Sequence, residues 1–142
     1  MVILCGSRLV QPARFQAARV ALIRFDPYMG SYPLAQRLLQ SPPGDLIEAD
    51  AYYAFSSVFF YTDRTALLLN GRNNNLEYGS YAPNAPAVFI DDAEFARLWQ
   101  TPRRYYLLIN APDLAHIDDV VGKASVFVIQ ESSGKYLLSN LR

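Results

Sequence analysis

The stretch that decides the fold is AVFIDDAEFARLWQTPRRYYLLI, residues 87–109. It opens with an apolar run, Ala87–Ile90, that predicts a short strand. Asp91, with Glu94 three residues later, resembles a capping box and predicts a helix over about Asp92–Gln100. A second apolar run ends the stretch as another strand. A strand, a helix and a strand in this order are typical of an α/β domain.

The same alternation extends over the rest of the chain. The expected helices are Pro12–Phe25, Ser31–Gln40 with Ser31 as its cap, Tyr53–Tyr61 and Pro112–Val121. The further strands expected are Asp45–Ala49, Thr65–Leu69, Arg104–Ile109, Ser125–Gln130 and Tyr136–Ser139. The aromatic and β-branched residues of Tyr53–Tyr61 leave a strand open there. The continuous apolar run Thr65–Leu69 suits a strand that is covered on both faces.

These elements predict a small layered α/β domain, in which helices flank a largely parallel central sheet. The turn residues 132–135 predict that the last two strands form a C-terminal antiparallel hairpin. A length of 142 residues predicts a single domain, with a helical N-terminal part over 13–41 and an α/β core over 42–142. Residues 1–12 lack clear anchors, and their order is left open.

Charge and composition narrow the classes of partner. Thirteen basic and thirteen acidic residues cancel, and the sequence pI is about 6.6. No basic stripe is visible, so no nucleic-acid partner is expected. Hydrophobic residues make up 51% of the chain and charged residues only 18%, with ten tyrosines. This composition suits surfaces that are partly dry and partly wet, including protein interfaces and sugar-stacking sites, and it equally suits a sheet-rich core.

Catalytic and cofactor motifs are absent from the sequence. It contains no GxGxxG, GxxxxGK[ST], GxSxG or HExxH pattern. The single cysteine, Cys5, and the single histidine, His116, have no partners at metal-ligand spacing. The carboxylate pairs Asp91–Asp92 and Asp118–Asp119 are best interpreted as helix capping and solvated surface. We therefore expect no catalytic residue, no metal and no cofactor in this chain.

The candidate binding segment is NGRNNNLEYGSYAPNAPAVFID, residues 70–91, whose turn-forming residues predict a long irregular loop. It follows a predicted strand, at the edge where α/β sheets bind ligands. The candidate binding residues in it are polar or aromatic: Asn70, Arg72, Asn73, Asn74, Glu77, Tyr78, Ser80 and Tyr81. Asp63 and Arg64, just before the strand, are further candidates and suit an ion pair or a hydrogen-bonding staple. A purely structural loop is the competing interpretation.

A family resemblance rests on several segments of the sequence. They are Phe25–Tyr28, Ser31–Ala35, Tyr52–Arg64, Leu69–Ser80 and Val88–Asp91, together with Phe95 and Trp99. From about Val20 to the C-terminus, the chain resembles the extracytoplasmic C-terminal part of bacterial membrane glycosyltransferases of the protein O-mannosyltransferase and aminoarabinose transferase superfamily. The matching positions are mostly aromatic, Gly and Asn residues.

The resemblance implies a non-catalytic domain at the periplasmic or extracytoplasmic face of the inner membrane. Its partners would be the transmembrane half of the same enzyme, which holds the catalytic acidic residues, and a glycan or lipid-linked sugar such as a polyprenyl-phosphate sugar. The apolar opening MVILCGSR is too short to span a bilayer, so the chain as given is expected to be soluble. The alternative that stays open is a free-standing α/β module that binds a sugar or another small ligand.

Overall fold

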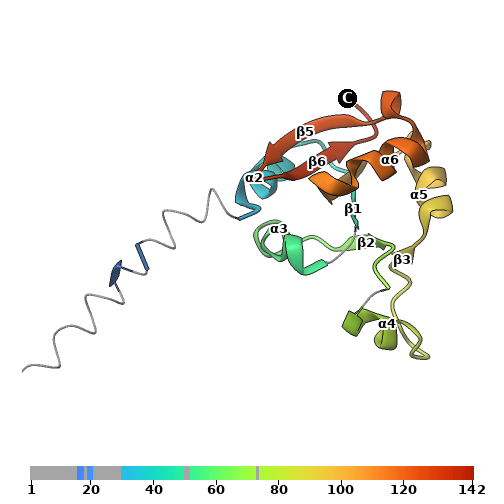
Figure 1. The fold of residues 1–142 in the computed structure, drawn as a ribbon, viewed down its shortest axis with the longest axis horizontal. Coiled ribbons are helices and arrows are strands. Elements are labelled where there is room, and N and C mark those ends of the chain that lie inside the picture. Colours follow the sequence, from blue (N-terminus) through green and yellow to red (C-terminus); the bar gives the residue numbers. More distant parts are fainter. Residues whose placement is uncertain (1–15, 18, 21–29, 50–51, 73) are drawn as a thin grey trace, which may run out of the picture.

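A computed structural model describes residues 16–17, 19–20, 30–49, 52–72 and 74–142. The chain forms a six-stranded sheet in the order β3-β2-β1-β4-β6-β5 (Figure 1). Strands β1 to β4 are parallel to one another, whereas β6 pairs antiparallel with both β4 and β5. The predicted fold class, a largely parallel sheet with a C-terminal antiparallel hairpin, is therefore confirmed.

Most element boundaries lie close to those expected from the sequence. The strands are β1 Asp45–Ala49, β2 Ala66–Leu69, β3 Phe89–Ile90, β4 Tyr105–Asn110, β5 Phe127–Ser132 and β6 Lys135–Ser139. The α-helices are α2 Tyr32–Gln40, α3 Ser56–Thr62, α4 Asn74–Ser80, α5 Asp92–Trp99 and α6 Leu114–Val121, with 3-10 turns at Tyr52–Phe55, Ala111–Asp113 and Lys123–Ser125. The ambiguous aromatic run Tyr53–Tyr61 is thus helical.

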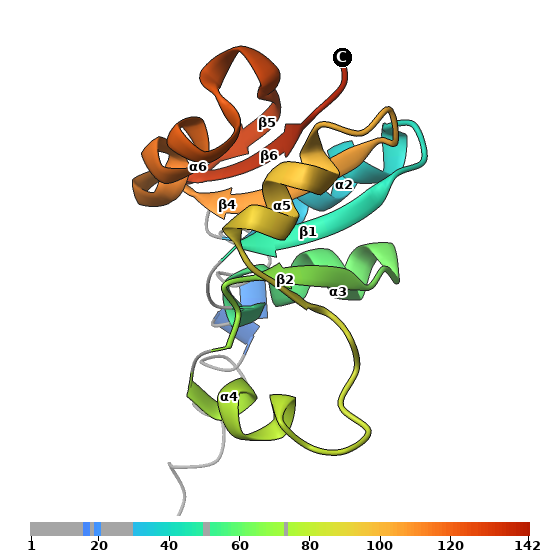
Figure 2. The ribbon, with the colours of Figure 1, turned by 90° about the vertical axis from the view of Figure 1, so that its right-hand side faces the viewer.

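Helices cover both faces of the sheet (Figure 2). Successive strand side chains point to opposite faces, so Leu107 joins the core under α5 and α6 and Leu108 joins the core under α2 and α3. The first core is closed by Phe95, Trp99 and Ile117, which are buried. The second is closed by buried side chains of α2 and α3. The central strand β4 is buried over residues 105–109, which makes it the middle of the domain.

Local chemistry explains two of the connections. The Asp91 carboxylate accepts a hydrogen bond from the backbone N–H of Glu94 at 2.9 Å, so the predicted cap of α5 is confirmed on that side. The Glu94 carboxylate itself pairs with Arg97. In the β5–β6 turn, Ser133 and Gly134 have φ of 53° and 73°. Positive φ at both central residues is the geometry of a two-residue hairpin turn.

Three expectations are corrected. The segment after β2 is not irregular throughout, because residues 74–80 form α4 by local helical hydrogen bonding. The β2 strand packs on both cores, through Leu67 and Leu69 on one face and Ala66 on the other, but it is covered less fully than expected, since only Leu69 in it is buried. Ser31 precedes α2 but makes no side-chain cap. Its hydroxyl instead donates to the Ala54 carbonyl at 3.4 Å and accepts from Lys135 Nζ at 3.1 Å, which ties α2 to the turn before α3.

Most of the expected Pro12–Phe25 helix, and the whole of the segment 1–12, lie outside the described residues. Residues 16–17 and 19–20 are described, and they are helical and exposed. Within the described part of the chain, no helix has the length and apolarity needed to cross a membrane.

Candidate functional site

The candidate site lies at the carboxyl ends of the parallel strands β2 and β3. Asn70 follows the last residue of β2, and Asp91 follows the last residue of β3. Between them the chain leaves the sheet, forms α4 and returns (Figure 2). A hollow of about 430 Å³ at this edge is lined by Asn70, Gly71, Arg72, Phe89, Ile90 and Asp91. The structure thus places the predicted segment at the edge where open α/β sheets bind ligands.

Arg72 supplies a positively charged side chain to the lining of this hollow. Its guanidinium carbon lies 5.4 Å from the centre of the Phe89 ring and 5.7 Å from the centre of the Tyr81 ring. Both distances allow a cation–π contact, so the two rings hold the guanidinium in place while it stays exposed. A guanidinium positioned in this way presents N–H donors to an anion or to sugar hydroxyls.

A chain of polar contacts continues from the hollow towards α6. Asn70 Nδ2 donates to Asp92 Oδ1 at 2.9 Å, and His116 Nε2 lies 3.0 Å from Asp92 Oδ2. Partial burial by itself would raise the pKa of Asp92. The hydrogen bonds from Asn70 and His116, with the charge of His116, outweigh it and hold this pKa below its ordinary value. The Asp92 carboxylate therefore stays ionised and fixes both neighbours.

The remaining candidates of this segment lie on α4 or just after it. Tyr78 and Tyr81 are 86% and 69% exposed, and Glu77 is exposed as well. The Ser80 hydroxyl donates to the Glu77 carbonyl at 2.7 Å, so it is engaged within the helix. Asn73 and the side chain of Asn74 lie outside the described residues. The described residues thus offer one exposed carboxylate and two exposed phenol rings, and the Tyr81 ring lies beside Arg72.

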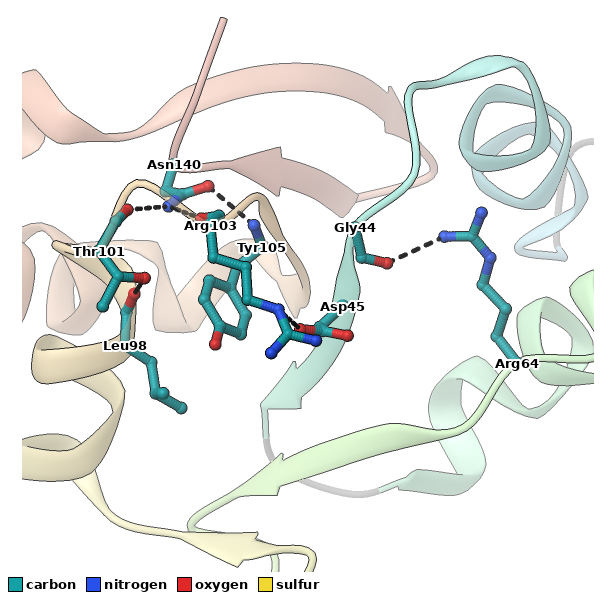
Figure 3. Close-up of polar contacts among 8 residues, drawn as sticks. All are labelled: Gly44, Asp45, Arg64, Leu98, Thr101, Arg103, Tyr105 and Asn140. Atoms are coloured by element: carbon teal, nitrogen blue, oxygen red, sulfur yellow. Dashed lines mark hydrogen bonds and ion pairs between the residues drawn. The ribbon is translucent and has the colours of Figure 1, made fainter.

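Asp63 and Arg64 do not join the other candidates. They precede β2, at the amino ends of the parallel strands, whereas the other candidates lie at the carboxyl ends. There they line a second hollow of about 590 Å³ with Gly44, Asp45 and Arg103. Arg64 Nη1 donates to the Gly44 carbonyl at 3.4 Å, and Arg103 forms an ion pair with Asp45 (Figure 3). Asp63 ends α3 in the left-handed conformation with φ of 50°. Arg64 is therefore a hydrogen-bonding staple between β2 and the start of β1.

Sequence reasoning missed Asp92 and His116 as parts of the site. The sequence favours helix capping or solvated surface for Asp92, and for His116 it indicates only that a metal site is not expected. Their side chains are 40% and 53% exposed, so both do lie at the surface. Their contact joins the first turn of α5 to α6, and no local motif signals a contact between residues so far apart in the sequence. Among the described residues, no group of three side chains is arranged to hold a metal ion.

Comparisons with known proteins bear on the fold. Neither a protein-family model nor a curated protein matches the sequence. Two solved structures of ArnT from Cupriavidus metallidurans, one bound to undecaprenyl phosphate and one in the apo state, are similar to this chain. Their TM-scores are 0.59 and 0.58, at 15% and 16% identity, over 78% of this chain.

The chain covers 20% of the length of each ArnT chain. ArnT is an aminoarabinose transferase, and the resemblance seen in the sequence was to the superfamily that includes this enzyme. At this identity the likeness concerns the fold. The chain therefore has the fold of a part of a membrane glycosyltransferase, the aminoarabinose transferase ArnT.

Proposed function

We propose that this chain is a non-catalytic extracytoplasmic domain of a membrane glycosyltransferase that uses a polyprenyl-phosphate sugar. The observation that carries the proposal is the likeness of its fold to ArnT, a protein solved in complex with undecaprenyl phosphate, over 78% of the chain. The chain matches only 20% of ArnT, so in this proposal the transmembrane remainder supplies the catalytic residues. The absence of any catalytic motif in the sequence agrees with that division of labour.

In this proposal the segment 70–91 faces the active site of the membrane half. It projects from the carboxyl ends of the strands and presents the exposed rings of Tyr78 and Tyr81, with the Tyr81 ring beside the guanidinium of Arg72. These groups suit the acceptor glycan or the catalytic loops of the membrane half, because phenol rings stack on sugars and Arg pairs with anions. The contact residues would be Asn70, Arg72, Asn73, Asn74, Glu77, Tyr78, Ser80 and Tyr81. Asp63 and Arg64 would form a separate contact at the opposite sheet edge.

The first test concerns the size and location of the native protein. An antibody raised against this domain is used to probe membrane and soluble fractions of the native cells. A membrane band much heavier than 16.0 kDa is expected. A soluble band at 16.0 kDa would overturn the proposal.

The second test concerns the role of the segment in transfer. In the intact enzyme, Tyr78→Ala and Arg72→Gln are each expected to lower transfer about tenfold or more, as expected when a group that positions the substrate is lost. Val128→Ala, at a 60% exposed position on the far edge strand β5, is the control and should leave transfer unchanged. Normal transfer by folded Tyr78→Ala and Arg72→Gln variants would contradict the proposed role of the segment 70–91 in transfer.

The hollow beside Arg72 favours a second candidate, a free-standing module that binds a small anionic sugar directly. A volume of about 430 Å³ is within the range of small-molecule sites. Calorimetry of the chain with a sugar phosphate tests this candidate. Saturable binding that is lost in Arg72→Gln, together with a soluble native protein, would replace the first candidate by the second.

A further inference from the structure

The second hollow lies at the amino ends of the parallel strands and has a volume of about 590 Å³. A volume of this order is typical of small-molecule sites. The pairing of β1 with β2 begins at Leu46 and Ala66, and the residues before this pair line the hollow from both strands. All of its lining residues belong to the described part of the chain. We call it the amino-end hollow.

One part of its lining is apolar or aromatic. Leu67 of β2 and Val88, which precedes β3, are half-buried, and Tyr105 of β4 is 5% exposed. Among the described residues, no group forms a hydrogen bond with the Tyr105 hydroxyl. A buried phenol usually has such a partner. The hollow thus offers a contact surface for apolar groups and a phenol whose hydrogen-bonding capacity a ligand can use.

Charged side chains flank the amino-end hollow on both sides of β1 (Figure 3). On one side Arg103 forms an ion pair with Asp45, with 2.6 Å between Nε and Oδ2. On the other side Arg64 Nη1 donates to the Gly44 carbonyl at 3.4 Å, which is long for such a bond. This weak bond uses one of the five N–H donors of the guanidinium. The other donors of Arg64 make no hydrogen bond within the described part of the chain, so a ligand can accept from them.

Asp63 and Thr65 add two further polar groups on either side of Arg64 in the sequence. Both residues are exposed, and neither side chain makes a hydrogen bond or ion pair with a described residue. A carboxylate only accepts, a guanidinium only donates, and a hydroxyl does both. Three consecutive residues therefore present every kind of hydrogen-bonding group to the hollow.

The charges of the amino-end hollow cancel. Its lining contains two guanidiniums, Arg64 and Arg103, and two carboxylates, Asp45 and Asp63. An anionic ligand would approach both carboxylates, and a cationic ligand would approach both guanidiniums, so neither gains a net attraction. The hydroxyl groups of a ligand can pair with either kind of side chain, because they both donate and accept. The lining therefore favours a neutral ligand that carries several hydroxyls.

We propose that the amino-end hollow binds one ring of a neutral sugar. Ring hydroxyls donate to the Asp63 carboxylate and pair with the Thr65 hydroxyl. They accept from the Arg64 guanidinium and the Tyr105 phenol, while the C–H face of the ring packs on the apolar part of the lining. This site goes beyond the proposed function, because it lies at the other end of the strands from the segment 70–91 and does not depend on a membrane half.

NMR titration of the isotope-labelled 142-residue chain tests the site. The probes are methyl α-glucoside, methyl α-mannoside and methyl β-galactoside. At least one of them should shift the amide signals of Gly44, Thr65 and Leu67 in a saturable way. Inorganic phosphate and methylammonium, which carry charge, should not saturate these signals at the same concentrations. Signals of the segment 70–91 report on the other hollow separately.

Two variants test the roles of the polar side chains. Arg64→Gln should weaken glycoside binding about tenfold, because it removes hydrogen bonds from a charged donor. Thr65→Val keeps the branched shape and removes only the hydroxyl, and it should weaken binding about threefold. Arg37→Gln is the matched control, since it removes the same charge from an exposed position on α2, outside the lining of the hollow. It should bind like the unmodified chain, and the same spectra show that each variant is folded.

Several results would overturn the sugar site. These are no saturable shift with any of the three glycosides, tighter binding of phosphate or methylammonium to the same residues, or equal glycoside binding by folded Arg64→Gln and Arg37→Gln. Shifts confined to the segment 70–91 would assign sugar binding to the other hollow instead. None of these measurements uses membranes or transferase activity, so failure of the sugar site and failure of the proposed function are separate results.

Discussion

The side chain of Asn140 accepts a hydrogen bond from the backbone N–H of Tyr105 at 2.8 Å. Asn140 follows β6 and Tyr105 is the first residue of β4, so this bond joins the end of β6 to the start of β4. The Asn140 amide also donates to the backbone carbonyls of Trp99 and Arg103, at 3.1 and 2.8 Å (Figure 3 shows the bond to Arg103). One 7% exposed amide thus joins α5, the loop after it and the C-terminal strand.

Asn140→Ala is expected to destabilise the domain by about 2–3 kcal/mol, because it leaves several buried backbone groups without partners. The free energy of unfolding in urea measures this effect. Asn84→Ala, at an exposed position between α4 and β3, is the control and should change stability by less than about 0.5 kcal/mol. Equal stability of the two variants would contradict the role assigned to Asn140.

Gly44 is required at the start of β1 because of close packing. A Cβ at this position would lie 2.8 Å from the Arg104 carbonyl oxygen and 2.9 Å from a ring carbon of buried Tyr106. Gly44→Ala should cost about 1–3 kcal/mol of stability as an overpacked site. Gly79→Ala, in α4, is the control substitution, because a Cβ at this position would meet no atom within 4 Å. It should be neutral, or should stabilise the helix by up to about 1 kcal/mol. Thermal denaturation measures the stability of both variants. A Gly44→Ala variant as stable as Gly79→Ala would contradict the close packing at Gly44.

The Asp92 contacts predict a pH dependence. Because the folded-state pKa of Asp92 is lowered, its ionised form contributes stability above the unfolded-state pKa of about 4. This contribution is lost as the pH falls through the folded-state pKa. His116→Gln should raise the pKa of Asp92 by removing a charged partner, with Asn70 still donating. Carboxyl titration by NMR of the unmodified chain and of the His116→Gln variant measures the shift. An unchanged Asp92 titration would show that the pair does not form in solution.

The α4 segment should open more easily than the sheet that carries it. Its Glu77 and Tyr78 are exposed and Leu76 is only half-buried, whereas residues 105–109 of β4 are buried. Amide hydrogen exchange should therefore be fast over residues 74–87 and slow over β1, β4 and β6. A partner that covers α4 should slow exchange there and leave the β4 rates unchanged. Slow exchange in the isolated chain would contradict the view of α4 as an open surface.

The sequence predicted the elements whose signals are local. Three such signals act over a few residues, and all appear in the structure as expected. They are the Asp91 cap, the periodicity of Phe95 and Trp99, and the two-residue turn at Ser133–Gly134. The α4 helix was missed for a related reason. Asn and Gly are poor helix formers, so residues 74–80 gave a turn signal even though the backbone closes helical hydrogen bonds there.

The candidate residues could be identified from their chemistry but not grouped from the sequence. Arg64 and Arg72 are eight residues apart in the sequence, but β2 lies between them. Because the strand is extended, Arg64 lies at its amino end and Arg72 lies beyond its carboxyl end. The packing of α5 beside α6 brings Asp92 to His116, which no pattern in the sequence encodes. The sequence by itself thus determined the order of helices and strands, since caps, turns and periodicity are properties of neighbouring residues. Only the tertiary structure decided which polar side chains share a site, because that depends on how distant elements pack.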